Sequence, residues 1–534
     1  MPTAPLNVTP TTSLNLSNIQ GNSIGGFNKD FQSNLFLKFT DDVAGRAWIT
    51  EISDAVAKSS SAAVIEFNNQ FSTLKAQGIH KPETIISALW VNLALSFQGL
   101  TALKLDATEL DAFPQAFRDG MANRAIGDEG ASAPATWIKP FNNSSDVHAV
   151  LIVAADDPDE LQRKVADITG TPAFMAGVEL LLDQPGRTRP DLPGHEHFGF
   201  KDGISQPGIR GVDSPDDPNR NPNQGHPGQD LLWPGEFIIG YATQCPRAKA
   251  GIDGPNPDPN QNSESGPAWT VDGSYLVFRR LQQDVAGFED NVATLAKTLG
   301  WSTELTGAKL VGRYKSGAPI EQRKFQSAPY TPPSTDPGDP NHGNPALGDS
   351  DTLNNNFEFH DNDPDGTFCP LSAHIRKVYP RDEDTGQPDP ESNAQKRRLL
   401  RRGIPFGAPF DPRDPGSAKE DRGLLFLCYQ NDIEEHFEYV QKYLVNNANF
   451  PLGAPSPGKD PIIAQSAEGP MRIADPKGPP VDIKHFVTTT GRRLFFLPID
   501  QRSPRYRKRG HLNRYGSAWL RAAARRRIRL ESCL

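Results

Sequence analysis

A strand that runs directly into an acidic helix start occurs twice in this chain, and this repeat constrains the fold more than any other feature. The first copy is VHAVLIVAADDPDELQRKV, beginning at Val147, and the second is GLLFLCYQNDIEEHFEYVQ, beginning at Gly423. In each copy an apolar run of strand length is followed by acidic residues, which favour a helix N-terminus. The repeat therefore predicts two related units of strands and helices.

The remaining periodic segments complete both units. Apolar or alternating runs bounded by turn residues predict strands, and longer runs with a 3.6-residue period predict helices. In the first half we expect strands at Ser33–Thr40, Leu89–Phe97, Val147–Ala154 and Gly177–Leu182, and helices at Ala44–Lys58 and Asp157–Ile168. In the second half we expect strands at Ser274–Leu281, Gly423–Gln430 and Leu494–Leu497, and helices at Asp284–Leu299 and Asp432–Val445.

This order of elements resembles a split β-α-β arrangement. The expected fold class is α+β, with two ferredoxin-like domains made of antiparallel sheets with flanking helices. A length of 534 residues also favours two or three domains. We place the domains at residues 15–210 and 235–499, followed by a tail at 501–534. Stretches rich in Pro, Gly, Asn and Asp are expected to be long surface loops: Asp213–Gln229, Gly251–Gly266, Tyr330–Asp365 and Leu452–Val481.

Charge is distributed unevenly along the chain. Residues 501–534 hold eleven of the 56 Lys and Arg but one of the 65 Asp and Glu, so the rest of the chain carries a formal charge of −19. An acidic body argues against nucleic acid as the partner, because a binder of the phosphate backbone needs a concentrated basic face. We expect the basic tail to be a disordered arm.

Cysteine usage and the N-terminus bear on the location of the protein. The four cysteines, Cys245, Cys369, Cys428 and Cys533, are widely spaced, which predicts free thiols rather than a disulfide scaffold or a zinc site. The first residues, MPTAPLNVTPTTSLNLSN, do not have the basic and apolar regions of a signal peptide, and no segment is apolar enough to predict a membrane span. We expect a soluble protein, cytoplasmic as written, with secretion left open.

The segment GHEHFGFKDGISQPG, Gly194–Gly208, is the densest candidate for a functional site. Gly199 and Gly203 allow backbone geometry that aims the carboxylate of Asp202 into a pocket. Taken alone, an Asp-Gly pair is more often an Asx turn at the surface. A further interpretation makes His195, His197 and Asp202 the ligands of a zinc or iron ion.

Two later segments are the other candidates. His374 lies in CPLSAHIRKVYPR among apolar residues, and a lone histidine in such a setting is more often a hydrogen-bonded, partly buried side chain than a ligand. The segment RRLLRRGIPFG, Arg397–Gly407, is basic, which alone indicates a solvated run of charge.

In combination and in this order, the segments resemble the dye-decolourising peroxidase family. The resemblance runs from about Ile19 to about Phe496 and includes SFQGLTAL, HFGFKDGISQPG, PGEFIIGY, GSYLVFRRL, AHIRK, LLRRGIPFG and LCYQNDIEEHF. It implies two ferredoxin-like domains with a haem pocket mainly in the second. It also implies one haem b per chain, and hydrogen peroxide and organic reducing compounds as the substrates.

The resemblance assigns roles residue by residue. Asp202 of GFKDG matches the distal acid, His374 of AHIRK matches the iron ligand, and Arg401 matches the distal arginine, with Arg402 its easily confused neighbour. Arg376 is expected to meet a haem propionate. Asp432, or else Glu434, is expected to accept the second N–H of His374.

These residues suit peroxide cleavage, which needs a proton moved between the two oxygens and charge stabilised on the leaving one. The predicted function is a peroxidase of bulky phenolic or dye-like substrates. One alternative is a haem-binding or iron-releasing protein, as in a deferrochelatase. A second is a haem-free metal hydrolase that uses His195, His197 and Asp202. No membrane or nucleic-acid partner is expected, and the oligomeric state is not indicated.

Overall fold

The computed structural model describes residues 14–77, 86–143, 146–215, 223–244, 257–262, 266–321, 348–350, 353–385, 390–452, 457–465, 471–473 and 481–498. The predicted tail at 501–534 lies outside the described residues, as do Cys245 and Cys533. The other two cysteines, Cys369 and Cys428, are buried free thiols. No helix within the described ranges is both long and apolar enough to cross a membrane.

The N-terminal half forms one β-α-β-β-α-β repeat. Its four strands pair antiparallel in the order β2-β3-β1-β4. Their bounds, with those of the two main covering helices, are β1 (Phe31–Phe39), α2 (Asp42–Lys58), β2 (Leu89–Leu95), β3 (Ala149–Ala155), α7 (Pro158–Thr169) and β4 (Val178–Arg187). A third helix, α3 (Ser61–Ala76), follows α2. This order of strands is the ferredoxin-like arrangement expected from the sequence.

The acidic start of the first repeated phrase acts as a helix cap. Asp157 accepts a hydrogen bond from the N–H of Glu160 at 2.7 Å, and Pro158 occupies the first helical position of α7. Both features satisfy or remove N–H groups that a helix start leaves unpaired. The sequence signal and the local structure agree here.

The C-terminal half repeats the same order of strands, β10-β12-β9-β15. The elements are β9 (Ser274–Gln283), α9 (Val285–Leu299), α10 (Thr303–Val311), α11 (His374–Val378), β10 (Leu400–Arg401), β11 (Ile404–Phe406), β12 (Gly423–Gln430) and β15 (Val487–Leu497). The helix expected after β12 is present but is wound as two π-helical segments, η10 (Ile433–Glu438) and η11 (Val440–Val445). Asp432 begins η10 by accepting the N–H groups of Glu434 and Glu435.

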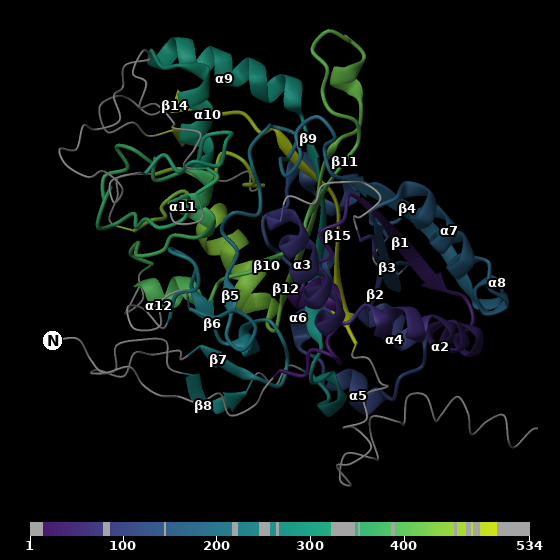
Figure 1. Cartoon of the computed structure of the whole chain (residues 1–534). Coiled ribbons are helices and arrows are strands. Elements are labelled where there is room, and N and C mark those ends of the chain that lie inside the picture. The colour runs from purple at the N-terminus through teal and green to yellow at the C-terminus, as the bar shows by residue number, and fades with distance from the viewer. Residues whose placement is uncertain are drawn as a thin grey trace, which may run out of the picture.

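The two repeats share a single sheet. Strand β15 pairs with β2 through Phe496 and Leu95, which joins the halves into nine strands. At the far edges of the sheet, β4 and β11 also pack together. They lie so close that a Cβ atom added to Gly186 of β4 would be only 2.5 Å from Ile404 Cγ2 of β11. The sheet therefore curls until its edges meet, with α2 and α7 outside one half of it and α9, α10 and α11 outside the other half (Figure 1).

Side chains alternate between two hydrophobic clusters along the central strands, as the two-residue period of a strand requires. Tyr275 and Val277 of β9 face the cluster that contains residues of α2 and α7. Leu276 and Phe278 face a second cluster inside the curled sheet, where Phe36 of β1 meets them. Its ring centroid lies 4.9 Å from that of Phe278. The interior cluster is therefore made by both repeats together.

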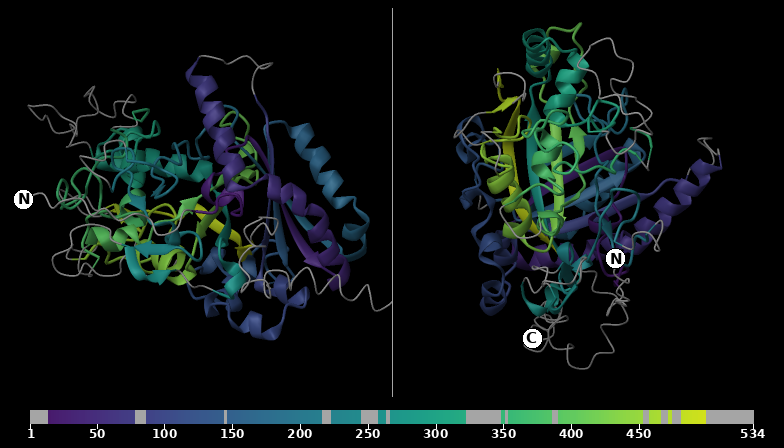
Figure 2. Two further views of the ribbon diagram at one scale, coloured as in Figure 1. Left: turned by 60° about the horizontal axis from the view of Figure 1, so that its bottom comes forward. Right: turned by 90° about the vertical axis from the view of Figure 1, so that its left-hand side faces the viewer.

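Long insertions carry two of the main candidate residues, whereas Arg401 lies on strand β10 of the C-terminal repeat. Asp202 lies between β4 and β9, and His374 lies between α10 and β10. In two further views these insertions gather on the side of the molecule away from the N-terminal repeat (Figure 2). The domain limits of 15–210 and 235–499 stay a prediction.

Replacement of Phe36 by Ala should lower the free energy of unfolding by roughly 3–5 kcal/mol, the usual cost of truncating a buried aromatic side chain. Phe36 is fully buried, and its partners Phe278 and Phe495 belong to the other repeat. Urea unfolding followed by tryptophan fluorescence measures this loss. The control is Val43→Ala on α2, which is 61% exposed. An unchanged midpoint for Phe36→Ala would contradict a shared core.

Candidate active site

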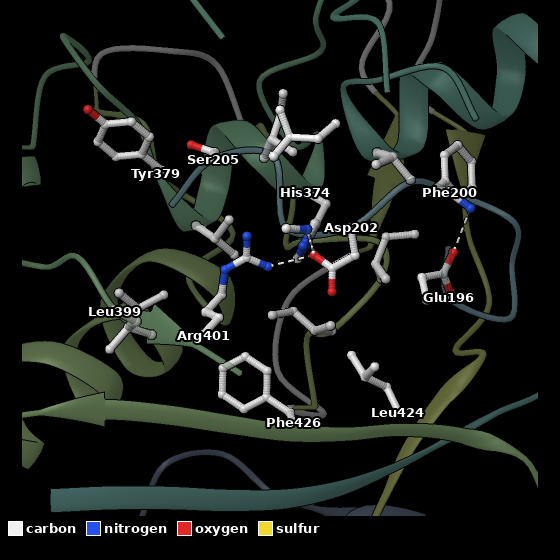
Figure 3. Close-up of a pocket in the computed structure, with 18 of the residues that line it drawn as sticks. Glu196, Phe200, Asp202, Ser205, His374, Tyr379, Leu399, Arg401, Leu424 and Phe426 are labelled. Atoms are coloured by element: carbon white, nitrogen blue, oxygen red, sulfur yellow. Dashed lines mark hydrogen bonds and ion pairs between the residues drawn. The ribbon is translucent and has the colours of Figure 1, made fainter. Parts of the chain in front are cut away.

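Three of the candidate residues line one cavity on the helical side of the C-terminal repeat. Its sheet wall is formed by Leu281 of β9 with Leu424 and Phe426 of β12. The opposite wall includes Ile375 and Val378 of α11, Val440 of η11, and Ile462 and Ile463. Asp202, His374 and Arg401 also line this cavity, so three segments far apart in the sequence converge as expected (Figure 3).

Asp202 and Arg401 form an ion pair within the cavity. Arg401 Nη1 donates to Asp202 Oδ1 at 2.8 Å, and the N–H of Gly203 donates to the same oxygen at 2.6 Å. The Asp202 side chain is 39% exposed, and that exposure faces the cavities on either side of it. Burial opposes ionisation of Asp202, but the charge of Arg401 and these hydrogen bonds outweigh it and lower its pKa. The carboxyl is therefore held as an anion.

The carboxylate of Glu196, which was not among the predicted site residues, organises the loop that carries Asp202. Glu196 accepts the N–H groups of Phe198 and Phe200, each at 2.8 Å, and Gln283 Nε2 donates to it at 2.6 Å. Burial raises the pKa of Glu196 despite these bonds. The sequence signal for this turn is an acidic residue, Glu196, at the start of a glycine-rich segment. Its carboxylate can then accept the N–H groups two and four residues later.

Two glycines fix the direction of the same loop. Gly199 and Gly203 have φ values of +91° and +82°, a region that L side chains rarely adopt. The N–H of Asp202 donates to Gly194 O at 3.0 Å, which closes the loop directly before the carboxylate. The expected role of these glycines in aiming Asp202 agrees with this geometry.

His374 is held by an aspartate that the sequence did not reveal. Its Nδ1 lies 2.8 Å from Asp460 Oδ2, and the other oxygen of Asp460 accepts the N–H groups of Ile462 and Ile463 at 2.7 and 3.0 Å. Asp460 is fully buried. Its carboxylate therefore accepts a hydrogen bond from Nδ1–H, which leaves the lone pair of the His374 ring on Nε2.

The expectation that Asp432 or Glu434 supports His374 is wrong. Asp432 caps η10 through two backbone N–H groups, and Glu434 pairs with Arg124. Asp460 lies in the segment Leu452–Val481, for which the high content of Pro and Gly predicts a surface loop. Only the tertiary structure brings this loop beneath α11.

Arg376 does not line the cavity, which corrects the expectation that it meets a propionate. It is fully buried and forms ion pairs with Asp363 and Glu383, and it donates to Cys369 O at 2.8 Å. Residues two apart on a helix point in different directions, so Arg376 leaves the cavity that His374 faces. Its charge is already neutralised by two carboxylates.

Two other buried arginines do line the cavity. Arg313 and Arg381 both donate to Asn355 Oδ1, at 3.1 and 2.7 Å, and otherwise to backbone carbonyls. Within the described ranges, neither has a carboxylate partner. Burial and the charge of Arg381 lower the pKa of Arg313 to about 9. Such a pair is an unneutralised cationic wall, suited to an anionic group.

Arg402, the neighbour of Arg401, has a separate role. Its guanidinium donates to the carbonyls of Asn22, Ser23 and Ile24 at 3.0, 3.2 and 2.6 Å. These are the carbonyls of the last three residues of the helix α1 (Gly21–Ile24). Arg401 is therefore the arginine of this pair that contacts Asp202.

The proposed metal site of His195, His197 and Asp202 is not formed. His195 bonds the carbonyls of Pro193 and Lys315, and His197 Nε2 bonds Phe406 O at 2.8 Å. In the part of the chain that the structure describes, no three His, Cys, Asp or Glu side chains are grouped to hold a metal ion. Backbone carbonyls occupy both ring nitrogens of His195 and the Nε2 of His197.

A second cavity lies on the other side of the ion pair. It is lined by polar side chains including Asn22, Asn28, Gln32, Gln206 and Arg402. Both cavities share Glu196, Asp202, Gly203, Arg401 and Leu424. The ion pair therefore stands in the wall between an apolar inner cavity and a polar outer one.

Comparisons with known proteins agree with the resemblance seen in the sequence. Residues 18–190 match the family model described as the DyP dimeric alpha+beta barrel domain, and residues 251–450 match the Dyp-type peroxidase C-terminal model. The chain is 31% identical to dye-decolorizing peroxidase AauDyP1 of Auricularia auricula-judae over 91% of this chain and 86% of that protein.

Comparison of the fold with solved structures also finds dye-decolorizing peroxidases. The structure of an ancestral D-type dye decolorizing peroxidase matches with a TM-score of 0.72 and 33% identity, over 92% of this chain and 98% of that one. A deferrochelatase of Yersinia pestis is 28% identical, over only 35% of this chain and 31% of that protein.

His197 should make stability depend on pH. Burial lowers its pKa to about 4 from an ordinary 6.5, so it stabilises the fold above pH 6.5, and this stability is lost as the pH falls toward 4. The shift corresponds to roughly 3 kcal/mol. The difference in unfolding free energy between wild type and His197→Gln should change by about this amount between pH 7 and pH 4. The exposed His360→Gln is the control, and a difference that is constant with pH would contradict this account.

Proposed function

This chain belongs to the dye-decolourising peroxidase family, and from that premise we propose that His374, Asp202 and Arg401 form the centre of its haem-dependent peroxidase activity. The observation that carries the proposal is the Asp202–Arg401 ion pair in the same cavity as a histidine whose Nδ1 is bound by a buried carboxylate. One haem b per chain is the proposed cofactor. Hydrogen peroxide and bulky phenolic or dye-like compounds are the proposed substrates.

The cavity residues suit a haem. The walls are largely aliphatic and aromatic, and His374 offers an Nε2 lone pair to an iron ion. Arg313 and Arg381, rather than Arg376, are the guanidinium groups without a carboxylate, and we assign the propionates to them. When bound, the haem supplies an iron that accepts a peroxide oxygen and stores the oxidising equivalents later drawn from the donor.

Asp460 tunes His374 as an iron ligand. A carboxylate that accepts the Nδ1–H fixes the ring orientation and makes the imidazole more electron-rich. Asp460 is itself fixed by two backbone N–H groups, so it holds this position without the aid of solvent. This arrangement favours the high oxidation state that a peroxidase requires.

Asp202 is placed to move a proton. Its Oδ1 is taken by Arg401 and Gly203, which leaves Oδ2 to accept a proton from one peroxide oxygen and return it to the other, which departs as water. Because its pKa is lowered, Asp202 remains a base at acidic pH. Arg401 provides fixed positive charge for the departing oxygen.

The outer cavity is the proposed route for peroxide. Asn28 and Gln206 line this polar cavity, and Asp202 and Arg401 line both it and the apolar one, so a small polar molecule in the outer cavity can contact the ion pair. Haem storage or iron release gives no reason for a base and a cation in this wall. Peroxide cleavage needs both, so turnover is favoured over the iron-releasing alternative.

Asp202→Asn keeps the shape of the side chain but removes the proton acceptor. It should slow the reaction of the ferric protein with peroxide by roughly 10²–10⁴-fold. Arg401→Leu should slow it by roughly 10²–10³-fold, and the two losses should not multiply, because both residues act on one bond cleavage. Stopped-flow absorbance at the Soret band measures each rate. A wild-type rate for Asp202→Asn would reduce Asp202 to a positional role.

Two different measurements distinguish the role of His374, the proposed iron ligand, from the role of Asp460, its hydrogen-bond partner. His374→Ala should lose most of its haem, whereas Asp460→Asn should keep haem but raise the reduction potential of the iron, because the charge behind the imidazole is gone. Spectroelectrochemistry gives the potential, and the pyridine haemochrome assay gives the haem content. Asp432→Asn is the matched control, since Asp432 caps η10 only. A shift in Asp432→Asn but not in Asp460→Asn would overturn this assignment.

A further inference from the structure

The side-chain amide of Gln206 binds both backbone groups of Arg401. Gln206 Nε2 donates to Arg401 O at 2.8 Å, and Arg401 N–H donates to Gln206 Oε1 at 3.2 Å. We propose that Gln206 is a positioning residue that sets Arg401 relative to Asp202, and that it acts on the peroxide reaction only through Arg401. The proposal rests on the proposed function of this ion pair.

Arg401 needs such a partner because its strand is short and lies at an edge. Strand β10 has only two residues and ends the sheet. The next residue, Arg402, donates its N–H to Leu427 O of β12 at 2.7 Å. Backbone groups alternate in direction along a strand, so those of Arg401 face the open side. The amide of Gln206 occupies the place that a peptide group of a further strand would take.

Gln206 also belongs to the loop that carries the other half of the ion pair. It follows Asp202 by four residues, and between them Ser205 O accepts Arg398 Nη2 at 3.1 Å. The Asp202 loop and the Arg401 segment are therefore joined by the ion pair, by the Gln206 amide and by Arg398. Arg401 is therefore fixed at its backbone by Gln206 and at its guanidinium by Asp202.

Loss of the amide should displace Arg401 more than it destabilises the fold. Gln206 lines the polar outer cavity, where water replaces the two lost hydrogen bonds. Water does not hold the backbone of Arg401 at a set distance from Asp202. A displacement of about 1 Å in a catalytic group costs on the order of 10²-fold in rate.

The first test is Gln206→Met, which has similar length but no amide. The reaction with peroxide should slow by roughly 10- to 10²-fold. Fluoride binding to the ferric haem reports on Arg401 without turnover, because a guanidinium donates to an anion on the iron. Fluoride affinity should fall roughly tenfold, the scale of one hydrogen bond to a charged group. Gln229→Met, which loses contacts with Gln206 O and His226 N–H but none with Arg401, should match wild type in both assays.

A double-mutant cycle separates positioning from general damage. In the Arg401→Leu background, Gln206→Met should have no further effect on peroxide rate or fluoride affinity. An equal effect in both backgrounds would overturn the proposal, as would wild-type behaviour of Gln206→Met. If Arg401→Leu and Asp202→Asn also react like wild type, the proposed function itself fails. If only those two are impaired, this inference alone fails.

Gln206→Glu provides a second test if the methionine variant does not fold. The ionised carboxylate keeps an acceptor for Arg401 N–H but presents a second acceptor to Arg401 O. Once protonated, the introduced carboxyl again has one donor and one acceptor, like the amide. Fluoride affinity relative to wild type at the same pH should therefore recover as the pH falls. A ratio that does not change with pH, in a folded variant with full haem content, would contradict the proposal.

Discussion

The ion pair between Asp202 and Arg401 is the interaction on which the candidate site depends. Burial alone would favour the neutral acid, and the adjacent guanidinium reverses that preference. The two residues are 199 positions apart, and Asp202 comes from an insertion whereas Arg401 lies on strand β10. A base of this kind exists only when the Asp202 loop and strand β10 are held together, so Glu196, Gln206 and the loop glycines all serve one contact.

Buried arginines divide into two groups by what neutralises them. Arg376 has Asp363 and Glu383 and therefore belongs to the scaffold. Arg313 and Arg381 face the cavity with amide and carbonyl acceptors, and no carboxylate partner within the described residues. A buried cation without a counter-charge is costly, so its retention points to a bound anion. The same reasoning explains why the expected contact between Arg376 and a propionate is wrong. The motif places Arg376 two residues after His374, but tertiary contacts with Asp363 and Glu383 decide that its charge is neutralised within the protein.

The sequence predicted the elements that follow from local patterns. The alternation of strand β9 and the acidic start of α7 each have a direct cause in burial or capping, and both were read correctly. Asp460 was not accessible in this way, because it lies in a Pro- and Gly-rich segment without periodicity. The curl of the sheet was also missed, since the pairing of β15 with β2 depends on contacts between halves. His195 and His197 looked like ligands only because backbone acceptors are invisible in a sequence.

One repeat holds the cavity although both have the same order of strands. In the N-terminal repeat, α2 and α7 pack directly on the sheet, and residues such as Trp48 and Leu161 fill the space between them. In the C-terminal repeat, α11 and the segment around Ile462 line the cavity together with residues of the sheet. A close-packed core closes any gap that its side chains can reach, so a lasting cavity needs rigid elements that keep its walls apart. The insertions provide this separation, and they also carry His374 and Asp460. In this chain, the residues that keep the cavity open are therefore the neighbours of those that act in it.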